Sequence, residues 1–195
     1  GPKSNRDETL YTGELYTRTS QQVTKLSALK NAVGAFVDTV QANQPSEGTH
    51  RIAIVGFASG YSYGLYRYSY DNTELFVGQT QYRYNGGDRN YDASDEQAAQ
   101  NHYFEALQPA DSQNLRNSIN ALDADGGTLT NYGMEMANGI LNTVNDSKSG
   151  KVVIVFTDGQ PGWEGYDDDV AREAVSQADT ARNKGATVYS VGVFN

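Results

Sequence analysis

Apolar residues recur at intervals of three and four in the first part of the chain, which is the period of a helix with one buried face. This pattern predicts a helix over residues 23–40, before which the polar residues 1–22 predict a loop or a short hairpin. A β-branched, mostly apolar run over 50–59 then predicts a buried strand. The apolar positions of the helix are Val23, Leu26, Leu29, Val33, Phe36, Val37 and Val40.

The second half of the chain alternates between helical and extended patterns. The predicted elements begin with a short helix capped by Asp111 or Ser112, a Gly-rich loop over 126–130, a helix over 131–144 and a strand over 151–157. A helix that follows residues 167–169 and ends at about 184, and a strand over 186–194, complete the series. Short connections between alternating strands and helices favour right-handed crossovers. We therefore predict an α/β fold with a doubly wound, mostly parallel sheet flanked by helices, whose strand over 151–157 is buried on both faces.

Residues 60–110 interrupt this alternation. Positions 60–100 hold eight of the 14 Tyr residues and few aliphatic ones, and Tyr66, Tyr68 and Tyr70 alternate as if on one face of a strand. We expect an inserted, Tyr/Gly/Asn-rich excursion at the surface of a single domain spanning 1–195. These rings either form a recognition surface for a ligand or pack on one another to hold the insertion together.

Composition narrows the classes of function. The 195 residues include 15 Lys and Arg against 24 Asp and Glu, which gives a formal charge of −9. This charge argues against binding of nucleic acid or anionic membranes and suits a cation, a basic partner or simple solubility. The chain has no Cys, which excludes disulfides and thiolate chemistry, and no apolar run long enough for membrane insertion. Neither a catalytic triad nor a phosphate-binding loop is present, so we predict that the protein is not an enzyme.

Oxygen-bearing side chains stand at two points where ligands bind in α/β folds, near the carboxyl ends of strands. Asp158 follows the strand over 151–157 directly, and Thr128 and Thr130 lie on the Gly-rich loop before a helix. A carboxylate with hydroxyls is an all-oxygen set suited to a hard cation such as Mg²⁺. Taken singly, each has a plainer role, because a loop Thr often caps a helix and a strand-end Asp often forms a turn.

Four segments in order resemble a known family. They are HRIAIVGFAS, GGTLTNYG, KVVIVFTDGQPG and ATVYSVGVF, and together they are similar to von Willebrand factor type A (VWA) domains of the kind found in surface and pilus adhesins of Gram-positive bacteria. The resemblance covers roughly residues 23–59 and 111–195.

The resemblance implies a metal-ion-dependent adhesion site. Thr128 and Asp158 would hold a divalent cation, most often Mg²⁺ with Mn²⁺ or Ca²⁺ as alternatives, and Thr130 is the fallback for Thr128. A carboxylate of a protein or glycan ligand would complete the coordination. The implied protein is an extracellular adhesion module attached to a cell wall or pilus. An intracellular partner domain of an ATPase or chelatase and a structural pilus module without a working metal site stay open.

The sequence departs from the family in one respect that concerns the metal. The family's Asp-x-Ser-x-Ser motif, which ends its first strand, follows no apolar strand here, and the family's closing helix is missing. We expect a domain trimmed at both ends or one that has lost its metal site. If the domain is trimmed, we expect this chain to bind divalent cations weakly or not at all, and we expect the lack of a central strand to open its core.

Two further features near Asp158 have alternative interpretations. Trp163, the only Trp, either contacts a ligand at the rim of the site or anchors its loop by packing. The acidic run from Asp167 to Asp169 either forms an accessory cation site or caps and charges the first turn of the following helix.

Overall fold

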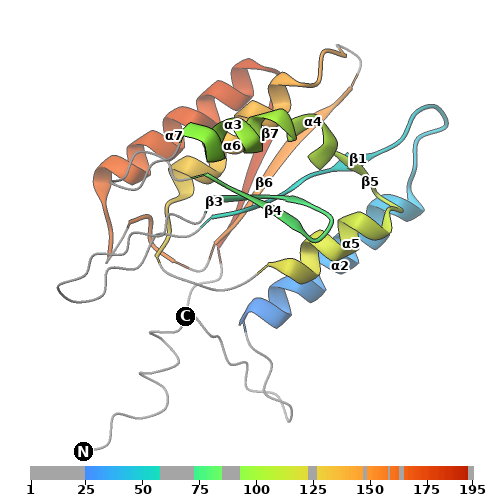
Figure 1. Ribbon diagram of the computed structural model, residues 1–195, viewed down its shortest axis with the longest axis horizontal. Helices are drawn as coiled ribbons and strands as arrows, with labels where there is room; N and C mark the ends of the chain where they lie inside the picture. The colour runs from blue at the N-terminus through green and yellow to red at the C-terminus, as the bar shows by residue number, and fades with distance from the viewer. Residues whose placement is uncertain are drawn as a thin grey trace, which may run out of the picture.

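The structure is a computed structural model that describes residues 25–57, 73–84, 93–122, 127–146, 149–157, 159–162 and 165–192, with the backbone alone at 83–84 and 93–95. A layer of strands lies between two layers of helices (Figure 1), which confirms the mixed α/β class. One helical layer holds α3 (Ala93–Asn101), α4 (Tyr103–Ala106), α6 (Thr130–Asn142) and α7 (Asp168–Asn183), and the other holds α2 (Lys25–Ala42) and α5 (Gln113–Ala121).

The described strands form three small sheets rather than one. β1 (Arg51–Ile52) pairs with β5 (Gln108–Pro109), β2 (Ile54–Gly56) pairs with β3 (Thr73–Val77) and β3 with β4 (Thr80–Tyr84), and β6 (Lys151–Thr157) pairs with β7 (Ala186–Gly192). The β6–β7 pair is parallel and the others are antiparallel. Within the described residues, the predicted parallel sheet is therefore seen only in β6 and β7.

β6 lies where the apolar run predicted a strand, but its burial differs from the prediction. None of its residues is fully buried, and the side chain of Val152 is 56% exposed. Among the described residues, β6 pairs with β7 alone. The other edge of β6 therefore has no described strand beside it. The prediction that this strand is buried on both faces is wrong for the part of the chain that the structure describes.

The region expected to be a surface excursion contributes to the core. β3 lies within 60–110, and its Leu75 and Phe76 are 0% exposed. Leu75 packs with Ala99, Ala106, Met136 and Ile140 in a cluster between the strands and α6. The expected surface position does not hold for β3, because strand alternation sends Leu75 to one face of the sheet and Phe76 to the other.

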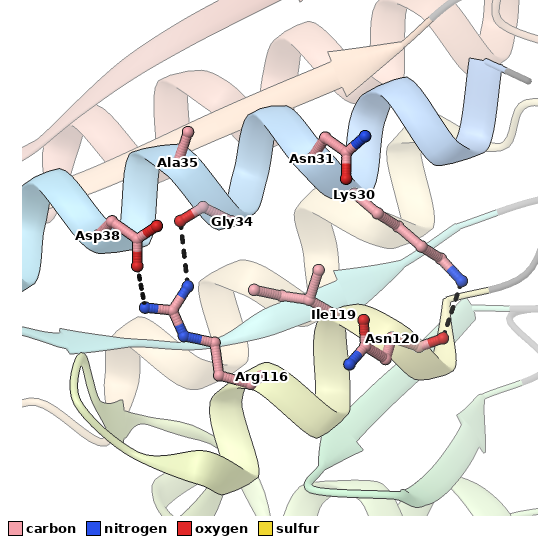
Figure 2. Close-up of a pocket in the computed structure, with 8 residues that line it drawn as sticks. All are labelled: Lys30, Asn31, Gly34, Ala35, Asp38, Arg116, Ile119 and Asn120. Atoms are coloured by element: carbon pink, nitrogen blue, oxygen red, sulfur yellow. Dashed lines mark hydrogen bonds and ion pairs between the residues drawn. The ribbon is translucent and has the colours of Figure 1, made fainter. Parts of the chain in front are cut away.

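A second cluster joins α2 and α5 to the strands. Val33 and Val37 of α2 pack with Leu115 and Ile119 of α5, and Phe156 of β6 lies against the same cluster. Polar contacts clamp the two helices from outside (Figure 2): the Arg116 guanidinium donates to Gly34 O at 3.1 Å and to Asp38 Oδ1 at 2.6 Å, and Lys30 Nζ donates to Asn120 O at 2.8 Å. The pocket drawn in Figure 2 lies between α2 and α5, and the side chains of Lys30, Asp38 and Arg116 that line it already hold the two helices together.

The predicted helix ends are confirmed by their caps. The Ser112 hydroxyl accepts from Asn114 N at 3.1 Å at the start of α5. The Asp167 carboxylate accepts from Asp169 N at 2.9 Å and Val170 N at 3.3 Å at the start of α7. Gly185, with φ of 82°, follows the end of α7 as predicted. None of the described helices is long and apolar enough to cross a membrane.

Candidate functional site

The Gly-rich loop and the loop after β6 are joined by their backbones. Thr128 N donates to Gly162 O at 2.8 Å, and Gly162 N donates to Thr128 O at 2.9 Å, so the two residues form an isolated antiparallel bridge. Gly162 has φ of 144°, a conformation that side-chain-bearing residues rarely adopt. The bridge fixes the loop before α6 beside the carboxyl end of β6, where the parallel pair ends with Thr157 opposite Gly192.

The Thr128 side chain faces the residue that follows Asp158. A Cβ added to Gly159 would overlap the Thr128 hydroxyl oxygen and lie 3.5 Å from its Cβ. The Gly159 backbone is also fixed by a hydrogen bond, because its N–H donates to the Thr157 hydroxyl at 3.3 Å. Asp158 itself lies outside the described residues. The two loops that were predicted to share an ion are therefore adjacent, while the position of the Asp158 carboxylate stays a prediction.

Two buried polar groups at the start of α6 lack partners among the described residues. The Thr130 side chain, 9% exposed as a residue, leaves its hydroxyl oxygen without a hydrogen bond. Asn131, 3% exposed, donates through Nδ2 to Glu173 Oε2 at 2.8 Å but leaves Oδ1 without a partner. Because a buried oxygen without a partner costs free energy, each of these atoms is available to a donor or a cation.

The oxygen atoms here fit part of a hard-cation site. The hydroxyls of Thr128 and Thr130 are ligands of the kind that Mg²⁺ and Ca²⁺ accept. The described residues contain no cluster of three or more His, Asp or Glu side chains close enough to hold a metal ion. A cation at this point would thus depend on Asp158 and on further oxygen ligands.

The acidic run after the loop caps a helix, as one of its two interpretations predicted. Besides the cap made by Asp167, Asp168 Oδ2 and Asp169 Oδ1 lie 2.8 and 2.7 Å from the guanidinium nitrogens of Arg172. Tyr166 donates its hydroxyl proton to Asp168 Oδ1 at 3.1 Å, and this hydrogen bond is the main cause that raises the pKa of Tyr166. All three carboxylates therefore have partners within α7: Asp167 caps its first backbone N–H groups, and Asp168 and Asp169 pair with Arg172.

The remaining predicted site residues are not tested by the structure. Trp163 and the alternating Tyr66, Tyr68 and Tyr70 lie outside the described residues, so their proposed contact with a ligand stays a prediction. Sequence reasoning missed the contact between Asn131 and Glu173. The spacing of polar residues at 131, 135 and 138 indicates which side of this helix faces another polar element, but it does not identify that element as α7.

The comparisons with known proteins return one family. The family model described as von Willebrand factor type A domain matches residues 95–195. No curated protein and no solved structure matches the chain. The matched range includes Thr128, Thr130 and Asp158 and begins within the segment that the sequence pattern set apart as an insertion.

Proposed function

The chain belongs to the von Willebrand factor type A family, and we propose from this that it is a non-enzymatic ligand-binding module whose contact with its ligand depends on a divalent cation. Domains of this family are generally adhesion or ligand-binding modules and often bind such a cation. The proposed cation is Mg²⁺, with Mn²⁺ and Ca²⁺ as alternatives of the same ligand chemistry.

One observation carries the proposal: the Thr128 hydroxyl lies against Gly159, directly after Asp158. The backbone bridge between Thr128 and Gly162 holds the two loops in this arrangement. Since a hydroxyl and a carboxylate on adjacent loops can reach one ion, we assign Thr128 and Asp158 as ligands, with Thr130 as the fallback. The Thr130 hydroxyl lacks a hydrogen-bond partner among the described residues, which is consistent with that fallback role.

The proposed ligand is a protein or a glycan that offers a carboxylate. When bound, the cation supplies a positive charge with an open coordination position that a carboxylate oxygen can fill. Thr128 and Asp158 would hold the ion. Contact area for the ligand would come from the side chains of Trp163, Tyr66, Tyr68 and Tyr70. We further propose that the domain has the doubly wound, Rossmann-like arrangement that the family implies and that it acts outside the cell, on a bacterial wall or pilus.

The proposal is tested by two variants at the assigned ligands. Binding of acetyl-Gly-Asp-Gly amide in excess Mg²⁺ is followed by the amide shifts of Thr128 and Gly159, with the Asn-containing peptide as the uncharged twin. We expect shifts that vanish with a chelator. Thr128→Val and Asp158→Asn should each weaken Mg²⁺-dependent binding of the peptide about tenfold or more, because each removes an oxygen ligand of the cation.

Matched substitutions at exposed positions control for nonspecific effects. Thr80→Val and Asp111→Asn repeat the same chemical changes on exposed residues away from the site, and we expect binding by both to equal that of the unmodified chain. Shifts that persist with the chelator, or that Asp158→Asn leaves intact, would instead favour a structural module without a working metal site.

A further inference from the structure

The pocket between α2 and α5 has no part in the proposed cation site. It has a volume of about 360 Å³, and all of its lining residues belong to these two helices (Figure 2). Its size is within the range of pockets that hold small ligands or single side chains. Ile119, which is 3% exposed, supplies an apolar surface between the helices, and polar side chains stand at both ends of the pocket.

One end of the pocket holds a cation that has no anion beside it. Lys30 Nζ donates to Asn120 O at 2.8 Å, and this is its one hydrogen bond within the part of the chain that the structure describes. None of the ion pairs between described residues includes Lys30. Because a backbone carbonyl is neutral and takes one N–H, the ammonium keeps its charge uncompensated and two donors available.

An amide side chain stands beside the same ammonium. The Asn120 side chain lines the pocket next to the end of the Lys30 side chain (Figure 2). It is exposed and makes no hydrogen bond with any described residue. An Asn side chain offers two N–H donors, so this end of the pocket presents one charged and one neutral donor group to an acceptor.

The other end of the pocket carries a cation that is already paired. The Arg116 guanidinium donates to Asp38 Oδ1 at 2.6 Å and to Gly34 O at 3.1 Å. The Asp38 side chain is 70% exposed, so water weakens its attraction for the guanidinium. Of the three charged side chains that line the pocket, two are positive and one is negative, so the pocket is locally positive in a chain of net charge −9.

The net charge of the chain decides which kind of anion the pocket can take. At physiological ionic strength, exposed charges are screened beyond about 8 Å. A ligand with a single carboxylate therefore responds mainly to the pocket, whereas a polyanion also meets the negative charge of the rest of the surface. One unpaired ammonium with an amide beside it matches the single charge and two oxygens of a carboxylate.

The apolar surface of Ile119 favours a side chain over a free ion. A glutamate side chain has two methylene groups before its carboxylate, so these groups can lie on Ile119 while the carboxylate reaches Lys30. A small anion without such a stem would leave the apolar surface in contact with water and gain nothing from it.

We propose that the pocket between α2 and α5 binds a glutamate side chain of a partner protein, with Lys30 Nζ and Asn120 Nδ2 as donors to the carboxylate and Ile119 beneath the stem. The glutamate stands on a segment with few other acidic residues, because further negative charge would be repelled by the chain. This contact is independent of the cation site, because none of its residues lies in the loops of Thr128 and Gly159.

The test uses the whole chain in the presence of a chelator, so that its outcome is separate from that of the proposed function. N-acetyl-glutamate α-amide is titrated while the amide signals of Gly34, Ile119 and Asn120 are followed, with the uncharged N-acetyl-glutamine α-amide as its twin. We expect saturable shifts with a dissociation constant on the order of 10 mM, as suits one ion pair with a small apolar contact, and none with the glutamine probe.

Two variants with opposite expected effects assign the binding to the pocket. Lys30→Gln should weaken binding about fivefold, because it removes the unpaired charge. Asp38→Asn should tighten binding about twofold or more, because it removes a negative charge from the pocket and frees the Arg116 guanidinium. A merely structural role of these side chains would not produce tighter binding.

Matched substitutions elsewhere control for the change in net charge. Lys151 also donates to a backbone carbonyl, Val144 O at 3.1 Å, and Asp111 is exposed, so Lys151→Gln and Asp111→Asn should both leave binding unchanged. Equal shifts with the glutamine probe, equal binding by Lys30→Gln, or no tightening by Asp38→Asn would each overturn the proposal. Binding of glutarate but not of the capped glutamate would also overturn it, because that result indicates a site for a small molecule.

Discussion

Gly162→Ala is expected to break the bridge between the two loops of the candidate site. An added Cβ would overlap the carbonyl oxygen of Gly165 and lie 2.9 Å from Asp167 N, and the φ of 144° is itself strained for Ala. The strain costs of order 1–3 kcal/mol, and loss of the two hydrogen bonds with Thr128 adds about 0.5–1.5 kcal/mol each. Amide hydrogen exchange of Thr128 should therefore accelerate by roughly tenfold or more.

Gly165 provides the matched control for this prediction. Its φ of 145° is nearly the same, but an added Cβ would meet no atom of the described residues within 4 Å. Gly165→Ala carries only the backbone strain and should leave the exchange of the Thr128 amide close to that of the unmodified chain. If the two substitutions accelerated exchange equally, the close packing at Gly162 would not be what holds the bridge.

Phe76→Ala is expected to lower the free energy of unfolding by about 3–5 kcal/mol, the usual cost of emptying a fully buried aromatic position. Phe76 is 0% exposed, and its ring lies 3.1 Å from the place where a Cβ would stand on Gly56. The residue therefore holds β3 against β2. Equilibrium unfolding in urea measures the change.

Phe104→Ala makes the same chemical change at an exposed position. The Phe104 side chain is 56% exposed and lies under the Arg51 guanidinium, 4.6 Å from the ring centroid. Its loss should cost no more than about 1 kcal/mol. A cost at Phe76 as small as that at Phe104 would mean that residues 73–84 form a surface excursion after all.

The helices could be predicted from the sequence because their signals are local. The apolar periodicity that includes Val33 and Val37 predicts α2, and the capping side chains of Ser112 and Asp167 predict the starts of α5 and α7. Strand partners depend on residues distant in the sequence, which a local pattern does not contain. For that reason, β3 was expected at the surface, and β6 was expected to be buried on both faces.

For the candidate site too, the sequence predicts which loops carry the oxygen ligands but not the contacts between distant elements. The resemblance places Thr128 and Asp158 at one ion; the structure shows Thr128 beside Gly159 and Gly162, and the shared ion stays a prediction. The pairing of Asn131 with Glu173 could not be predicted, because it depends on how α6 packs on α7. Polar residues on a helix face show which side faces another polar element, but they do not identify that element.

The central claim is that Thr128 and Asp158 share one divalent cation, and relaxation by Mn²⁺ tests it most directly. A paramagnetic ion broadens nearby amide signals even when it binds weakly, so substoichiometric Mn²⁺ suits a chain expected to bind cations poorly. We predict that the signals of Gly127–Thr130 and of Thr157–Gly159 broaden first and that Asp158→Asn removes the effect. Broadening centred on Asp167–Asp169, or none at the Thr128 and Gly159 amides, would contradict the account.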